Sequence, residues 1–94
     1  MNIKNIKERN GGYFITEQDG EELGRMTYSN AGEDKFIIDS TQVQSEYEGR
    51  GVGTAMVRAS VDYARENALK IVPLCPFTAN VFVKHKEFRD VLYK

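Results

Sequence analysis

The sequence predicts a single α/β (α+β) domain, in which an antiparallel meander is followed by a parallel strand pair with helices on the sheet faces. Three observations support this prediction. The first half of the 94-residue chain is rich in β-forming residues separated by turn signals. The second half changes to an apolar repeat with helical spacing. A short apolar run then follows at a distance long enough for a parallel crossover.

Three strands are expected in the first half. Residues 10–12, Asn-Gly-Gly, are a turn signal before the first strand at 13–17. The Asp-Gly dipeptide at 19–20 is typical of a hairpin and leads into a return strand at 23–28. The longest strand is Lys35–Val43. Alternation along it predicts two faces: Phe36 and Ile38 on one, and Ile37, Thr41 and Val43 on the other.

Two helices and a short strand are expected in the second half. The first helix begins at Thr54, directly after the glycines, and stops at Asn67. Residues 70–75 form a mostly buried strand, and residues 78–85 form the second helix. An apolar tail, 88–93, must dock on the rest of the domain. The stripe expected to face the sheet from the first helix comprises Val52, Ala55, Met56, Ala59 and Tyr63.

Composition excludes several classes of function. The net charge of −1 argues against a nucleic acid as the main partner. No apolar run is long enough for a membrane span, and residues 1–4 carry no apolar signal core, so no membrane association is expected. The single cysteine forms neither an internal disulfide nor, alone, a metal site, and it favours a cytoplasmic location.

The stretch Glu48-Gly49-Arg50-Gly51-Val52-Gly53-Thr54 is the most informative part of the chain. Three glycines alternate between a strand and the start of a helix, where the backbone N–H groups lack partners and the helix dipole is positive. Such a loop favours phosphate binding at 49–54. The Thr54 hydroxyl would add a donor and Arg50 a modest, screened attraction. The alternative is a tight turn with no ligand.

Two other glycine motifs do not fit. A Walker loop requires Gly-x-x-x-x-Gly-Lys-Ser/Thr, and neither the spacing nor the lysine is present. A dinucleotide fingerprint requires a third glycine where Thr54 stands, and an acidic residue at the end of the next strand, where the chain has Leu74 and Cys75.

The remaining order of strand, glycine loop, helix, strand and helix resembles the GNAT superfamily of N-acetyltransferases. Residues 47–53, Tyr-Glu-Gly-Arg-Gly-Val-Gly, are similar to its diphosphate loop, with Gly51 and Gly53 at the two small positions. Residues 79–88 are similar to the family's final Ala-x-x-Leu-Tyr-x-Lys-x-Gly-Phe segment. Residues 73–77, Pro-Leu-Cys-Pro-Phe, resemble a short stand-alone branch that carries a cysteine at the end of this strand.

This resemblance implies a minimal GNAT-like fold, acetyl-coenzyme A as co-substrate, no metal, and acetyl transfer to an unidentified amine by a monomer or weak dimer. Val43 and Gln44 would pair through their backbone with the pantetheine arm, the alternative being ordinary sheet pairing. Cys75 is a candidate acyl carrier, with a tunnel-lining or packing role as the alternatives. His85 is a candidate general base or coenzyme A contact, with an exposed surface residue as the alternative.

Departures from the family pattern keep two other functions open. Glu48 stands where Gln or Arg is usual in the family, and Phe82 stands where many members have a tyrosine. The chain also begins close to the first strand. One alternative is therefore a non-catalytic binding module or sensor for coenzyme A or its acyl derivatives. Another is an interaction domain whose glycines are purely structural.

Overall fold

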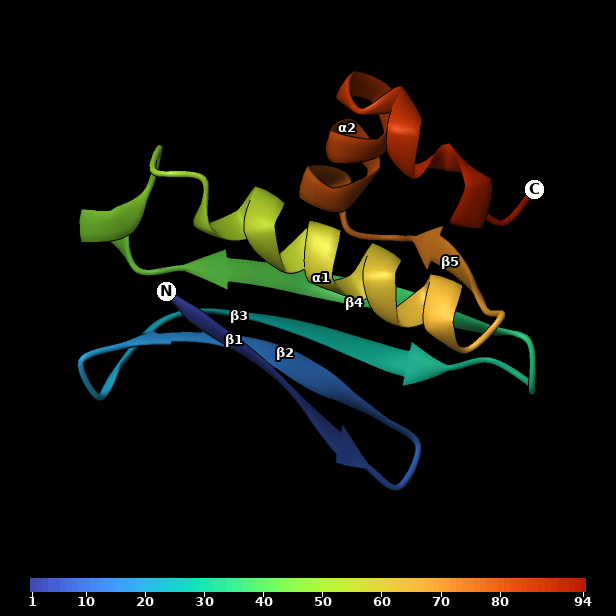
Figure 1. Ribbon diagram of the computed structural model, residues 1–94, viewed down its shortest axis with the longest axis horizontal. Helices are drawn as coiled ribbons and strands as arrows, with labels where there is room; N and C mark the ends of the chain where they lie inside the picture. Colours follow the sequence, from blue (N-terminus) through green and yellow to red (C-terminus); the bar gives the residue numbers. More distant parts are fainter.

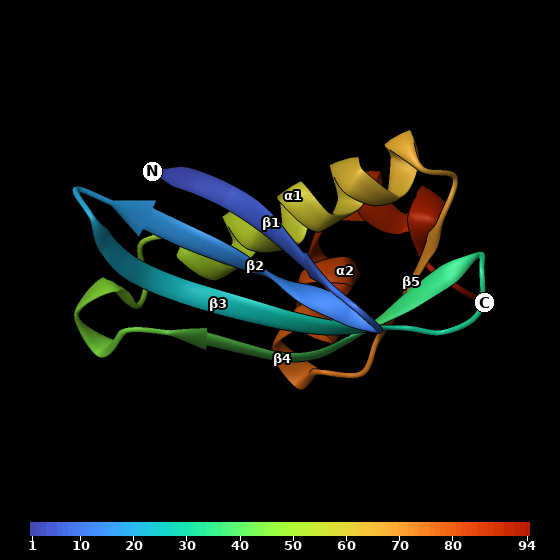
Figure 2. The same ribbon diagram turned by 90° about the horizontal axis from the view of Figure 1, so that it is seen from below.

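The computed structural model describes all 94 residues and contains one five-stranded sheet in the order β1-β2-β3-β4-β5. Strands β1 to β4 are antiparallel, and β4 and β5 are parallel. Helices α1 and α2 lie on one side of the sheet (Figures 1 and 2). The expected fold class is confirmed. The elements are β1 (Asn2–Glu8), β2 (Gly11–Gln18), β3 (Glu21–Asn30), β4 (Lys35–Val43), η1 (Ser45–Tyr47), α1 (Val52–Glu66), β5 (Lys70–Pro73), α2 (Pro76–Lys84) and η2 (Lys86–Val91).

The core lies between the sheet and the helices. Side chains from β2, β3 and β4 that face the helices are buried with residues of α1, α2 and η2 in a single cluster. The opposite face of the sheet has no helix over it (Figure 2). No helix is both long and apolar enough to cross a membrane.

Strand β1 is an additional strand that the expected three-stranded meander did not include. It pairs with β2 along Asn2–Glu8, although most of its residues are exposed. Only Ile3 and Ile6 are apolar in this segment, so the sequence carries no alternating pattern to predict a strand. Backbone pairing holds the strand, together with a hydrogen bond of 2.8 Å that the Tyr28 hydroxyl donates to Asn5 Oδ1.

Strand β4 has the expected bounds, but its predicted faces are wrong after Ile38. Thr27 pairs with Ser40 whereas Tyr28 pairs with Ile38, which leaves Asp39 as an extra residue in a β-bulge. Because an inserted residue shifts the alternation, Thr41 turns to the same face as Ile38. Thr41 there contacts Thr78 of α2, and Val43 packs against the core.

The face of α1 that is buried is also different from the expected stripe. Val52 and Met56 are buried as predicted, but Ala55, Ala59 and Tyr63 are only partly buried. Helix α1 packs against α2 and η2 as well as against the sheet. This second contact buries a wider arc, comprising Val52, Gly53, Met56, Val57, Ser60, Val61 and Ala64.

Strands β4 and β5 pair only over residues 35–38 and 70–73 and then separate. Beyond that point the Cys75 N–H donates a 3.1 Å hydrogen bond to the Ile38 carbonyl. Helix α2 then begins at Pro76, two residues earlier than expected, because proline is tolerated at the first helical position. The apolar tail docks beside α1, where Asp90 forms a 2.7 Å ion pair with Arg65.

Candidate active site

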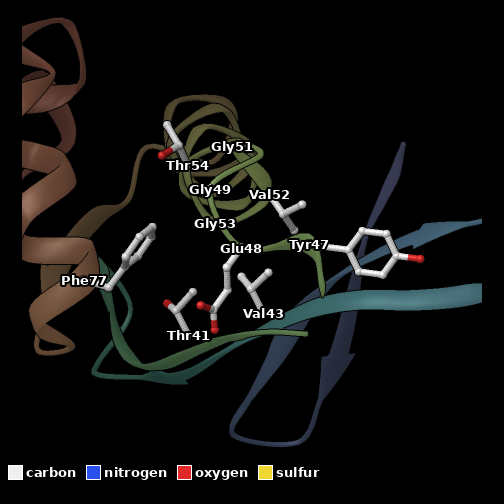
Figure 3. Close-up of a pocket in the computed structure, with 10 residues that line it drawn as sticks. All are labelled: Thr41, Val43, Tyr47, Glu48, Gly49, Gly51, Val52, Gly53, Thr54 and Phe77. Atoms are coloured by element: carbon white, nitrogen blue, oxygen red, sulfur yellow. The ribbon is translucent and has the colours of Figure 1, made fainter. Parts of the chain in front are cut away.

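A cavity of about 470 Å³ opens between the start of α1, the end of β4 and the start of α2 (Figure 3). It lies where β4 and β5 have separated, so no strand fills the space. Phe77 borders it from the α2 side, and the Glu48 side chain extends into it from the loop before α1. The lining residues are Thr41, Val43, Tyr47, Glu48, Gly49, Gly51, Val52, Gly53, Thr54 and Phe77.

Backbone N–H groups at the start of α1 form one wall of this cavity. The first hydrogen bond of the helix runs from the Ala55 N–H to the Gly51 carbonyl, at 2.9 Å. The N–H groups of Val52, Gly53 and Thr54 donate to no acceptor in the structure. No acidic side chain lies in the first helical turn to neutralise the positive end of the dipole. These donors are therefore available to an anion.

Each of the three glycines also has a local structural reason. Gly49 and Gly51 have φ angles of +77° and +81°, in the left-handed region that favours glycine. Gly53 is helical, but a Cβ atom there would lie 2.5 Å from Cζ of Phe77. The glycine pattern is thus needed by the turn itself. The unpartnered amides, rather than the glycines, point to a ligand.

The unpaired edge of β4 forms the opposite wall. The Gln44 N–H donates 2.9 Å to the Leu23 carbonyl, which fixes the alternation of this antiparallel pair. The N–H and C=O groups of Thr41 and Val43 consequently point away from β3, toward the side that β5 has left. The backbone of Val43 is therefore free for a ligand. The N–H of Gln44 is already used by the sheet, and its side chain donates to the Glu22 carbonyl.

The charges at the cavity oppose each other. Figure 3 shows the Glu48 carboxylate directed toward Thr41, inside the cavity. Arg50 lies outside it, with its guanidinium carbon 5.6 Å from the centre of the Tyr47 ring. A negative ligand on the α1 amides would meet attraction from the helix dipole and Arg50 and repulsion from Glu48.

Cys75 lies directly behind this cavity, at the N-cap of α2. Its thiol is 3.7 Å from the Thr41 hydroxyl, and Thr41 in turn lies 3.3 Å from the Thr78 hydroxyl. The residue is only 7% exposed. Burial raises the pKa of the Cys75 thiol. The N–H groups of Thr78 and Phe77 and the hydroxyls of Thr41 and Thr78 lower it, and their combined effect is the larger one. The net pKa is below its ordinary value.

His85 is at the opposite end of α2 from Cys75. A nine-residue helix separates them, which is about 14 Å at 1.5 Å per residue. His85 stacks on Phe88 and its Nδ1 lies 3.1 Å from the Glu87 carboxylate. The structure thus does not bring His85 to the cavity. Phe82 is also remote from it, because its ring is buried in the core.

Several residues of the site were not among the sequence candidates, including Thr41, Phe77 and Thr78. The side chain of Thr41 reaches the cavity only because the bulge at Asp39 turns it to the other face of the sheet. No residue pattern in the sequence predicts that bulge. Phe77 and Thr78 are brought there by the early start of α2. A proline directly after Cys75 is compatible with a helix beginning at that point, and this signal could have placed both residues. No three His, Cys, Asp or Glu side chains group in a way that could hold a metal ion.

Comparison with known proteins agrees with this architecture. The family described as GCN5-related N-acetyl-transferase matches residues 12–91. The solution structure of a GCN5-like candidate N-acetyltransferase from Staphylococcus aureus has a TM-score of 0.72 and 33% identity, over 98% of this chain and 87% of that one. A comparison with curated protein sequences returned no match.

Two less similar structures share the fold. Ribosomal-protein-alanine N-acetyltransferase from Brucella melitensis biovar Abortus 2308 has a TM-score of 0.71 at 18% identity, and the match spans 82% of this chain but 62% of that one. A candidate streptothricin acetyltransferase from Bacillus anthracis, solved with acetyl coenzyme A, has a TM-score of 0.60 at 19% identity, over 71% and 39% of the two chains. On the family match, the chain belongs to the GCN5-related N-acetyltransferase family.

Proposed function

We propose that this family member acts as one acetyltransferase domain over residues 1–94, binds acetyl-coenzyme A in the cavity between α1 and β4, and transfers the acetyl group to a primary amine. One observation carries the proposal. The unpartnered amides of the α1 N-terminus and the unpaired edge of β4 line the same cavity. An anionic group joined to an amide-containing arm fits the first wall with its charge and the second with its hydrogen bonds.

The diphosphate is assigned to the loop at 49–54. The N–H groups of Val52, Gly53 and Thr54 donate to its oxygens, and the Thr54 hydroxyl adds a further donor. Arg50 contributes a screened attraction. Glu48 weakens the binding because its carboxylate lies in the same cavity.

The pantetheine arm is assigned to the edge of β4. The backbone of Thr41 and Val43 offers N–H and C=O groups to the arm's amides, as a neighbouring strand would. The Val52 side chain supplies an apolar contact from the other wall. Gln44 has no free backbone N–H to offer and does not line the cavity.

The thioester then lies near Thr41, where β4 and β5 diverge. The lone pair of a neutral amine attacks the carbonyl carbon, the C–S bond breaks, and coenzyme A leaves as a thiol while the new amide loses a proton. In the alternative route the Cys75 sulfur attacks the carbonyl carbon, the C–S bond to coenzyme A breaks, and coenzyme A leaves as a thiol. The neutral amine then attacks the Cys75 thioester, whose C–S bond breaks to return the Cys75 thiol as the new amide loses a proton. The lowered pKa of Cys75 and its contact with Thr41 support that route. A role for His85 stays a prediction.

A titration followed by a turnover assay tests the proposal. Acetyl-coenzyme A should shift the amide resonances of residues 49–54 and of Thr41 and Val43 in the ¹⁵N-labelled protein. A panel of primary amines should then release free coenzyme A thiol. Resonances that do not move would overturn the proposal in favour of an interaction domain. Shifts without thiol release would overturn the catalytic part and assign the chain as a coenzyme A binding module.

Two substitutions separate the chemical routes. Cys75→Ala abolishes turnover if the acyl-cysteine is obligatory and leaves it unchanged if the amine attacks directly. His85→Gln leaves turnover unchanged if His85 is only a surface residue, and slows it if His85 acts as the base. Amide spectra of both variants must match the unsubstituted protein, so that a folding defect is not read as a catalytic one.

A further inference from the structure

Thr41 is the side chain through which the Cys75 sulfur meets the cavity. Cys75 is only 7% exposed and Thr78 is fully buried, and neither residue lines the cavity. Thr41 does line it, and its hydroxyl lies 3.7 Å from the Cys75 sulfur and 3.3 Å from the Thr78 hydroxyl. A hydroxyl group therefore stands between the thiol and the space that a ligand would fill.

Strand pairing fixes the direction of the Thr41 side chain. Thr41 lies opposite Met26 of β3, whose side chain is fully buried between the sheet and the helices. Residues directly opposite each other in an antiparallel pair share one face of the sheet, so Thr41 is held on the helix side. Figure 3 shows this side chain projecting from β4 into the cavity.

The Thr41 hydroxyl can exchange protons on two sides. A hydroxyl group has one proton to give and two lone pairs with which to accept. The Cys75 thiol donates to the Thr41 oxygen, and either hydroxyl of the Thr41–Thr78 pair can be the donor. When the thiol and Thr78 both donate to Thr41, its own proton is free for an acceptor in the cavity.

We propose that Thr41 is a catalytic residue that carries one proton between the Cys75 sulfur and the sulfur of coenzyme A. This inference rests on the acyl-cysteine route of the proposed function. As the Cys75 sulfur attacks the carbonyl carbon, its proton passes to Thr41 Oγ1. The Thr41 hydroxyl proton passes to the coenzyme A sulfur as the C–S bond of the donor breaks. In the second step the proton that the new amide loses returns to Cys75 through the same hydroxyl, so Thr41 is unchanged after each step.

Acylation of Cys75 by acetyl-coenzyme A without any amine isolates the first step. The mass of the intact protein, followed over time, gives the rate of thioester formation. Thr41→Val keeps the branched shape but removes the hydroxyl, and it should slow acylation about 100-fold near neutral pH. Thr41→Ser keeps the hydroxyl and should restore most of the rate. The matched control is Thr27→Val, which removes a hydroxyl that pairs with Ser40 at 2.7 Å and should leave the rate unchanged.

The pH profile separates a proton relay from a merely structural role. Where Cys75 is already a thiolate, coenzyme A can leave as a thiolate and no proton has to be carried. The loss in Thr41→Val should therefore shrink as the pH rises above about 8.5, the ordinary thiol pKa. Tyr47 and Glu48 also line the cavity, and the ratio of the two rates cancels their contribution because both proteins contain them. A loss that is the same at every pH, or Thr41→Ser as slow as Thr41→Val, would overturn the relay.

A measurement on the unsubstituted protein avoids any folding defect of the variants. Its acylation should be slower in D2O than in H2O near neutral pH, because protons move in that step, and an absent isotope effect would overturn the relay. Amines acetylated without any acetyl-Cys75 would refute the relay and retain direct acetyl transfer. Acetyl-Cys75 that forms with the expected pH profile but acetylates no amine would retain the relay and refute the proposed transfer.

Discussion

The two helix N-termini that meet at the cavity differ in what their free amides bind. At α1 the first three N–H groups have no acceptor, and the residue before the helix is a glycine with left-handed backbone. At α2 the residue before the helix is Cys75, whose side chain makes no cap hydrogen bond but whose pKa is lowered by the nearby amides of Thr78 and Phe77. The positive end of one dipole faces the cavity, and that of the other lies beside a buried cysteine whose pKa is lowered.

This difference separates a binding role from a chemical one. The start of α1 is the place for a charged ligand, because its first three N–H groups have no acceptor and their residues line the cavity. The α2 end instead holds Cys75, the proposed acyl carrier, whose pKa is lowered. Thr41 joins the two regions, since it lines the cavity and contacts the thiol.

Substitution of Gly51 should have the largest effect on the α1 side. Gly51→Ala places a side chain at φ +81° and should lower the free energy of unfolding by about 1–2 kcal/mol. It should also weaken acetyl-coenzyme A binding about tenfold, because a displaced loop loses at least one hydrogen bond to a charged group. Calorimetric titration and urea unfolding measure the two effects.

Gly20 provides the matched control. Its φ of +79° is nearly the same, and a Cβ there meets nothing within 4 Å, as at Gly51. Gly20→Ala should therefore cost similar stability and leave binding unchanged. An equal loss of binding in both variants would mean that the glycine loop has no special part in the ligand site.

Removal of the Glu48 charge should have a smaller effect, in the opposite direction. Glu48→Gln should tighten acetyl-coenzyme A binding about threefold, because one screened repulsion in a solvent-open cavity is worth less than 1 kcal/mol. The gain should shrink as salt is added. Glu46→Gln, in the same loop but not lining the cavity, is the control. Weaker binding in Glu48→Gln would show that the carboxylate makes a favourable contact with the ligand.

The smallest effect concerns the α2 side and is a pH dependence of stability. A thiol with a lowered pKa in the folded state binds fewer protons than the unfolded chain at intermediate pH. Relative to Cys75→Ala, the free energy of unfolding should thus rise with pH up to about 8.5, the ordinary thiol pKa, and fall as pH drops through the folded-state value. Urea unfolding of both proteins across this range checks the sign. The reverse slope would show that burial dominates at Cys75.

Several parts of the molecule were predictable because they depend on local chemistry. The Asp19-Gly20 turn and the bounds of β4 follow from backbone preferences that short segments carry by themselves, and α1 begins at Val52, only two residues before the expected Thr54. The sequence pattern that resembles the family's diphosphate loop likewise lies within one short segment, residues 47–53. These features need few long-range contacts, so the residue pattern suffices.

Other parts required the packed chain. Strand β1 has little apolar signal and exists because β2 offers it a backbone edge. The bulge at Asp39 arises from a shift in the pairing register between β3 and β4. That register depends on pairing and packing between strands that are not set by one segment alone. The same bulge put Thr41 at the cavity and Asp39 on the uncovered face. The separation of Cys75 from His85 likewise follows from the straight path of α2 between them.

Residue identity alone was thus enough for the class of fold and for the loop whose amides can receive an anion, since turn geometry and helix dipoles arise within a few consecutive residues. Packing decided which side chains share the cavity and in which direction the pKa of the Cys75 thiol is shifted. Those properties depend on strand register, burial and neighbours distant in the sequence, and they exist only once the chain has folded.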